Sequence, residues 1–139
     1  MREKKTLLQR ARIDIELAKE NIVKLDDELY LDVSAYHIHQ AIEKLLKFQI
    51  EHAGESYRKT HDLGLLWEEA EQIELSPPEW IWANRIQLNR YQSETRYGDD
   101  IVASRRELKE IVELAEAYYK KIEASIIVSE SPFSAEKLL

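Results

Sequence analysis

A chain of 139 residues with 34% charged and 44% hydrophobic residues has the composition of one folded domain that can bury a core. The chain has no cysteine, which excludes disulfides, thiolate catalysis and cysteine-based zinc sites. The formal net charge of −7 disfavours nonspecific nucleic-acid binding, which relies on clustered lysine and arginine.

The distribution of apolar residues along the sequence predicts neither a membrane span nor a signal peptide. No apolar run approaches the length of about 18 residues that a membrane span requires. The charged residues that follow Met1 lack the apolar core of a signal peptide. We therefore expect a cytoplasmic protein with no membrane partner.

The first expected helix covers about residues 4–25. Only three glycines and three prolines interrupt a chain rich in helix formers, which favours an all-helical fold throughout. Charged residues off the apolar stripe of this helix are expected to face water: Asp14, Glu16, Lys19 and Glu20. The stripe itself consists of Leu8, Ala11, Ile15, Ala18, Ile22 and Leu25. Leu7, Ile13 and Leu17 widen it, which fits either a partner helix from another subunit or a broad core face.

The second expected helix has two usable faces. Asp32 suits the N-cap, and the helix is expected to end near His52, before Gly54. An apolar stripe for the core is formed by Ile38, Ala41, Ile42 and Leu45. The other side carries a polar ridge, defined as His37, Gln40, Lys44 and Lys47. This polar ridge is either a solvated face or dimer seam, or a binding site, because histidine and glutamine both donate and accept hydrogen bonds. The first two helices are expected to pack as an antiparallel pair.

The second half of the chain predicts shorter elements. Thr60 or Asp62 is expected to cap a third helix, with His61 as a structural histidine that bonds backbone groups at its start. The run Ser76-Pro77-Pro78-Glu79 predicts a capping box and a fourth helix over residues 77–92. A turn-rich connection follows, and the last helix begins at Asp100 or Ser104. The tail after residue 125 either folds back or packs against a second chain.

Several chemistries are disfavoured by spacing. His37 and His39 lie about 200° apart around a helix, so they cannot chelate one ion together. Three scattered glycines form no phosphate loop, and no nucleophile-elbow motif occurs. We expect no metal and no cofactor.

Four segments in order together resemble the HEPN family, named for nucleotide-binding domains of higher eukaryotes and prokaryotes. They are Ala11 to Ala18, Asp32 to Lys44, Thr60 to Leu66, and Tyr91 with Thr95-Arg96-Tyr97. The resemblance spans about residues 7–122. It implies an up-and-down bundle of four or five helices, here residues 1–125 with a C-terminal tail at 126–139. It also implies a homodimer. Many members are ribonucleases, including toxins paired with a nucleotidyltransferase antitoxin.

The ribonuclease motif of that family is not present in its usual form. It consists of an arginine followed, roughly four to six residues later, by a histidine near the last helix. The histidines here are His37, His39, His52 and His61, and all of them precede Arg96. Gly98 also stands where relatives often have proline. The resemblance therefore implies a binding or regulatory protein, and we do not expect the usual ribonuclease activity of the family.

The predicted ligand is a nucleotide, an RNA segment or a partner nucleotidyltransferase. Ligand-binding candidates are the polar ridge together with His61, Arg96 and Tyr97. Lys44 and Arg96 would take phosphate charge, Tyr97 could stack on a base, and Gln40 could orient it. Alternatively, Arg96 forms an ion pair with an acid such as Glu43. Two other hypotheses stay open: a ribonuclease toxin with a rearranged site at His37 or His61, and a purely structural helical adaptor.

Overall fold

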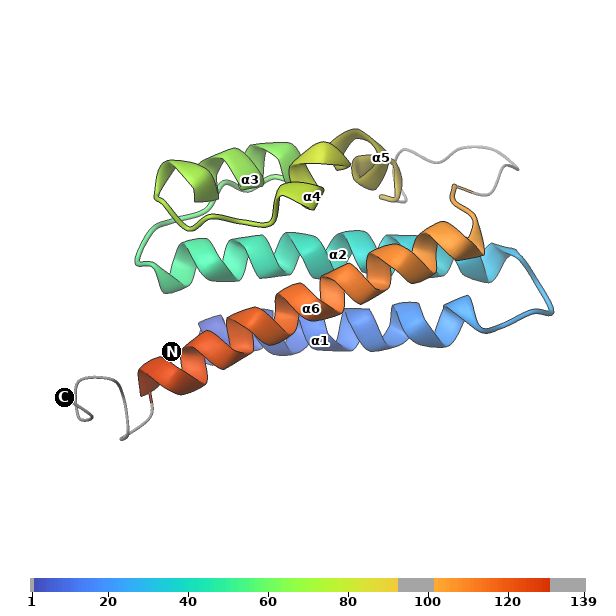
Figure 1. Cartoon of the computed structure of the whole chain (residues 1–139), viewed down its shortest axis with the longest axis horizontal. Coiled ribbons are helices and arrows are strands. Elements are labelled where there is room, and N and C mark those ends of the chain that lie inside the picture. Colours follow the sequence, from blue (N-terminus) through green and yellow to red (C-terminus); the bar gives the residue numbers. More distant parts are fainter. Residues whose placement is uncertain (1, 93–101, 131–139) are drawn as a thin grey trace.

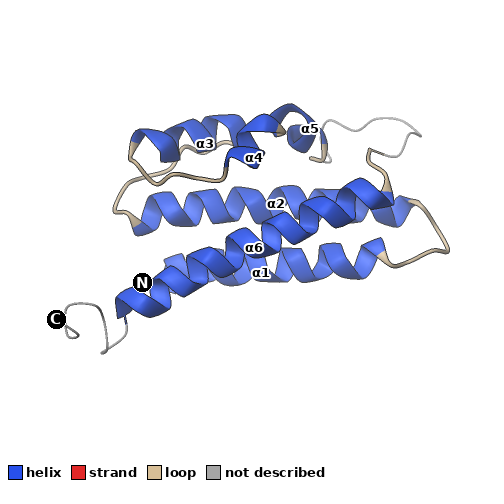
Figure 2. Cartoon of the chain, viewed as in Figure 1, coloured by secondary structure: helices blue, strands red, loops and turns tan. Residues whose placement is uncertain are grey.

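A computed structural model describes the backbone of residues 2–92 and 102–130 and the side chains of residues 6–92 and 102–126. It contains helices α1 (Arg2–Ile22), α2 (Leu29–His52), α3 (Leu63–Gln72), α4 (Glu79–Ala83), α5 (Arg85–Arg90) and α6 (Arg105–Glu130). No strand occurs in these described ranges (Figure 2). The all-helical bundle is confirmed. The described ranges contain six helices where four or five were expected, because the expected fourth helix is broken in two.

Helix α2 is the centre of the bundle. It packs against α1, α6 and α3, and Figure 1 shows α3, α4 and α5 on the opposite side of α2 from α1. The predicted apolar stripe of α2 is fully buried, as Ile38, Ala41, Ile42 and Leu45 are 0% exposed. Burial on most sides leaves α2 only a narrow polar strip, which is where the candidate site lies.

The α1–α2 connection lies earlier in the chain than expected, because α1 ends at Ile22 and α2 begins at Leu29. Helix α2 begins at Leu29, whose backbone N–H donates to Asp27 Oδ1 at 2.8 Å, so the expectation of Asp32 as N-cap is wrong. Leu31 is buried and continues the apolar stripe, which favours an earlier helix start. Asp32 instead accepts the backbone N–H of Val102 at 3.0 Å, before α6.

The start of helix α6 contacts the end of the bundle where α1 is connected to α2. Ser104 Oγ accepts the Glu107 N–H at 3.1 Å, which confirms Ser104 as its start. The Arg105 side chain donates to the carbonyls of Ile22 and Lys24 at 2.8 and 3.1 Å and so satisfies the end of α1. Helix α6 continues to Glu130. The expected division between bundle and tail stays a prediction, because residues 131–139 lie outside the described ranges. No helix in those ranges is long and apolar enough to cross a bilayer.

The fourth helix differs most from expectation. Ser76 has a φ of 49°, whereas a capping serine needs an extended backbone, so the predicted capping box is wrong. Asn84 interrupts the run between α4 and α5, and its side chain donates to the Trp80 carbonyl at 2.7 Å. The Trp82 ring lies 5.0 Å from the Trp67 ring and 3.8 Å from the Arg85 guanidinium carbon. The Trp82 ring is therefore packed between side chains of α3 and α5.

Candidate functional site

The polar ridge of α2 divides into two clusters, each centred on a buried carboxylate. The Asp14 cluster consists of Asp14, His37 and Lys44. The Glu43 cluster consists of Glu43, Lys47, His61 and His39. Gln40 is half-buried and, by helical position, lies on the α2 strip between them. The ridge is therefore two local ion-pair systems rather than one continuous row of free groups.

The Asp14 cluster joins α1 to α2. His37 Nδ1–H donates to Asp14 Oδ1 at 2.9 Å, and Lys44 Nζ donates to Oδ2 at 2.5 Å. Asp14 is only 7% exposed, so the expectation that it faces water is wrong. The reason is that His37 and Lys44 are two helical turns apart on one side of α2, and the packed α1 places Asp14 between them. Both basic groups are thus engaged by a carboxylate of the neighbouring helix.

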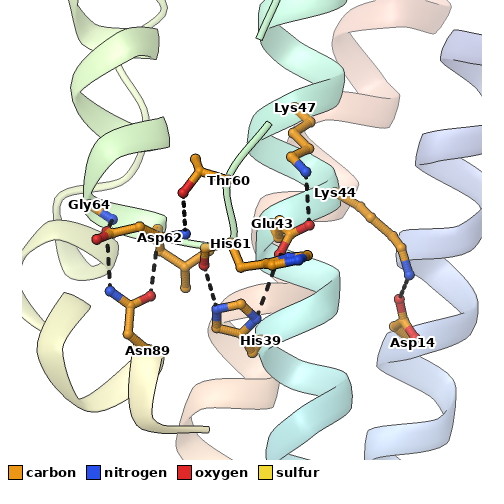
Figure 3. Close-up of polar contacts among 11 residues, drawn as sticks. Asp14, His39, Glu43, Lys44, Lys47, Thr60, His61, Asp62, Gly64 and Asn89 are labelled. Carbon is orange, nitrogen blue, oxygen red and sulfur yellow. Dashed lines mark hydrogen bonds and ion pairs between the residues drawn. The ribbon is translucent and has the colours of Figure 1, made fainter. Parts of the chain in front are cut away.

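The Glu43 cluster joins α2 to the segment before α3 (Figure 3). Glu43 is 4% exposed, and its Oε2 accepts from Lys47 Nζ at 2.9 Å. Its Oε1 accepts from His61 Nδ1–H, also at 2.9 Å. Lys47 in addition lies 5.2 Å from the Tyr57 ring. One buried carboxylate therefore holds an ammonium and an imidazole that come from two different elements.

His61 is the most accessible member of this cluster, with its side chain 55% exposed. The expectation that it bonds backbone groups is wrong for the side chain, whose partner is the Glu43 carboxylate. Because Nδ1–H donates to Glu43, the neutral ring leaves Nε2 as an acceptor. A histidine oriented in this way can accept a hydrogen bond or a proton from a ligand.

His39 lies behind this pair and is completely buried. Its Nε2–H donates to the His61 carbonyl at 2.9 Å, while its Nδ1 lies 3.9 Å from Glu43 Oε1. That Nδ1 has no hydrogen-bond partner among the described residues. Burial lowers the pKa of His39, and the Glu43 carboxylate, the His61 carbonyl and Asn89 oppose this only in part. His39 is therefore held neutral.

The start of α3 fixes the backbone that carries His61. Of the two predicted caps, Asp62 is the one that caps α3, with Oδ1 accepting the N–H groups of Gly64 and Leu65 at 2.9 and 3.2 Å. Asn89 of α5 donates to the same oxygen at 3.2 Å and accepts the Leu63 N–H at 3.0 Å (Figure 3). Helices α3 and α5 are thereby tied together beside His61.

Sequence reasoning did not single out Glu43, His39 or Asn89 as parts of a site. The four-residue spacings His39–Glu43 and Glu43–Lys47 were a usable signal, because such residues are neighbours on a helix. No comparable signal linked α2 to His61 or Asn89, since these contacts depend on how the loop and α5 fold back.

Arg96 and Tyr97, the remaining candidates, lie outside the described residues. The residues on either side of this segment are described. The Tyr91 hydroxyl contacts the Glu107 carboxylate, and the Gln87 side chain donates to the Val102 carbonyl at 3.3 Å. Burial raises the pKa of Tyr91, which stays protonated. The Asp32–Val102 bond places one flank about 18 Å along the α2 axis from Lys44. The expected meeting of Lys44 and Arg96 stays a prediction.

This architecture defines a small helical-bundle domain with a polar strip on its central helix. The model of the HEPN domain family matches residues 5–125, most of the chain, and the protein belongs to that family. It is accordingly a helical domain of a nucleotide- and RNA-related class. No curated protein and no solved structure matches the chain.

Proposed function

We propose that this protein is a HEPN binding domain that contacts a nucleotide or a short RNA segment through His61, Lys47 and Gln40. The observation that carries the proposal is the Glu43 carboxylate, which holds both His61 Nδ1 and Lys47 Nζ at 2.9 Å. Donors that are fixed before binding lose less conformational freedom when a ligand arrives. The Glu43 cluster is thus a pre-oriented polar surface.

The chemistry of the Glu43 cluster suits a phosphate-bearing ligand. The Lys47 ammonium has three donors, and only one of them is directed at Glu43. The His61 ring adds a second group that can bind a phosphate when protonated or a ligand N–H or O–H when neutral. His37 is held by Asp14 in the same way but is less accessible than His61, because its side chain is 21% exposed against 55% for His61. Arg96 and Tyr97 are predicted to add a phosphate donor and a stacking ring.

Protein partners are part of the same proposal. Family resemblance favours a homodimer and a partner nucleotidyltransferase, with a regulatory rather than a catalytic role. The net charge of −7 means that any RNA contact must be local, because the field of the whole chain repels phosphates. A short ligand is therefore favoured over a long duplex.

Fluorescence anisotropy with a labelled nucleotide and a labelled short RNA tests this proposal. We expect Lys47→Gln and His61→Gln each to weaken binding roughly tenfold, which corresponds to about 1.4 kcal/mol. Lys59→Gln is the matched control, since it removes one charge from an exposed position in the preceding loop. No binding by the unchanged protein, or an equal loss in the control, would refute the proposal.

A second candidate is a ribonuclease with a rearranged site. It is favoured by the Glu43–His61 pair, because a carboxylate that holds Nδ1–H leaves Nε2 able to act as a general base. Lys47 could stabilise charge that develops on the phosphate. RNA that stays intact with the purified protein across about pH 5 to 9 removes this candidate. If cleavage occurs, His61→Ala should abolish it.

A further inference from the structure

The connection between α1 and α2, at one end of the bundle, carries an exposed group of apolar side chains (Figure 1). Eight large apolar side chains are exposed in the described part of the chain, and four of them fall between residues 23 and 33. The other four lie one each on α1, α3, α5 and α6. The connection patch is defined as Val23, Leu25, Leu29 and Val33, whose exposure ranges from 41% to 76%. Single exposed apolar residues are ordinary, whereas a group of this kind marks a contact surface.

Hydrogen bonds hold the connection patch in place before any partner arrives. The Leu29 N–H donates to Asp27 Oδ1 at 2.8 Å and so fixes the start of α2. Arg105 of α6 donates to the carbonyls of Ile22 and Lys24 and so fixes the end of α1. A surface that is already ordered loses little conformational freedom when it binds.

The connection patch has an acidic surround. Three consecutive exposed carboxylates, at residues 26–28, lie in the middle of it. Residues 23–33 contain one further carboxylate, Asp32, and a single basic residue, Lys24. The Lys24 ammonium lies 4.5 Å from the centre of the Tyr30 ring. The patch therefore combines apolar surface with negative charge, and it attracts a segment of positive charge.

The same charge disfavours two other occupants. If two copies of the connection patch met face to face, their carboxylates would lie opposite one another, and like charges across an interface weaken binding. The surface of an anionic membrane is repelled for the same reason. Neither a second copy nor a membrane is therefore the favoured occupant.

Segments of this chain are also disfavoured as occupants. Residues 93–101 carry three carboxylates and one arginine, so they have the same sign of charge as the patch. Residues 131–139 are too short to return to it. Glu130 lies about 38 Å along α6 from Arg105, which contacts the connection, whereas nine extended residues span at most about 32 Å.

We propose that the connection patch docks a basic amphipathic helix of a partner protein, with apolar residues on one side and lysine or arginine beside them. Leu29 and Val33 are about one helical turn apart and share a side of α2, so they form a row for the apolar side of that helix. The carboxylates of residues 26–28 are available to its basic residues. This proposal goes beyond the proposed function, because Leu29 lies about 21 Å along the α2 axis from Glu43.

Fluorescence anisotropy of a labelled helical peptide of leucine and lysine, titrated with the full chain, tests this proposal. We expect the peptide to bind, and to bind less tightly as salt is raised, because salt screens exposed charges. Leu25→Ser and Leu29→Ser should each weaken binding at least tenfold, which corresponds to about 1.4 kcal/mol. Leu114→Ser is the matched control, because it removes an exposed leucine of α6, and it should leave binding unchanged. Each replaced side chain is exposed, so all three variants should keep the melting temperature of the unchanged protein.

A second pair of variants separates the patch from the net charge of −7 of the whole chain. Asp26→Asn combined with Glu28→Gln should weaken peptide binding roughly fivefold, because two exposed charge pairs are lost. Glu68→Gln combined with Glu113→Gln removes two exposed carboxylates of α3 and α6 and should leave binding unchanged. Asp27 is kept in both, because its side chain holds the start of α2.

Four results would overturn the proposal. The first two are no binding of the leucine-lysine peptide and equal binding of a leucine-glutamate peptide. The third is an equal loss of binding in either control. The fourth is a dimer of the unchanged protein, or its binding to anionic vesicles, that Leu25→Ser and Leu29→Ser abolish, because the occupant would then be a second copy or a membrane.

Discussion

Replacing Asp14 by asparagine tests whether the basic residues of the polar ridge are structural or free. Asp14 is 7% exposed and accepts one bond from His37 and one from Lys44. Hydrogen bonds to charged groups contribute about 1.5–3 kcal/mol each, and asparagine can still accept one of them. We therefore expect Asp14→Asn to lower the free energy of unfolding by about 2–3 kcal/mol, measured by urea denaturation with far-UV circular dichroism.

A double-mutant cycle with Lys44→Met isolates the pair. Residues in direct contact typically show coupling of about 0.5–3 kcal/mol, and we expect a value in the upper half of that range. Glu16→Gln is the matched control on the same helix, because Glu16 pairs with Arg12 at 3.0 Å but its side chain is 59% exposed. Its cost should stay below about 0.5 kcal/mol. A loss for Asp14→Asn no larger than this control would show that Lys44 is free for a ligand.

Three further outcomes are expected. Burial lowers the pKa of His39, so the unfolded chain binds a proton at this residue at a higher pH than the folded chain does. The free energy of unfolding should therefore fall as the pH drops below 6.5, by at most about 1.36 kcal/mol per pH unit. His39→Gln should remove this part of the pH dependence, measured by urea denaturation at several pH values. Asp62→Ala should lower the free energy of unfolding by about 1 kcal/mol through loss of the α3 cap. Gly64→Ala should lower the melting temperature despite the better helix propensity of alanine, because the added Cβ would lie 3.0 Å from Arg85 Cδ, and a rise would contradict this packing.

Periodicity predicted the long helices and their buried faces but not the contacts between them. The stripe of Ile38, Ala41, Ile42 and Leu45 predicted the buried face of α2, because helical spacing decides which residues share a side. It could not show which neighbour covers the other sides. Asp14 was assigned to water for this reason, since the partners that bury it come from α2.

Short sequence motifs were also a poor guide to local structure where the backbone conformation does not fit them. Ser76 and Glu79 have the spacing of a capping box, yet the positive φ of Ser76 prevents it, and Asn84 ends α4 after one turn. The indole Nε1–H of Trp67 in α3 donates to the Pro78 carbonyl at 2.8 Å. A contact with another helix therefore helps to fix the backbone at the start of α4. His61 was noticed from its place before a helix, but its partner Glu43 depends on the course of residues 53–62.

Arg105 has a consequence for the order in which the chain folds. Helices α1 and α2 are joined by a short connection, so their pairing closes a small loop, whereas the bond from Arg105 to the Ile22 carbonyl links residues 83 apart. Non-local contacts form late, because the entropy of loop closure opposes them until other structure is in place. The α1–α2 hairpin is thus expected to form the early nucleus, with the last turn of α1 frayed until α6 arrives.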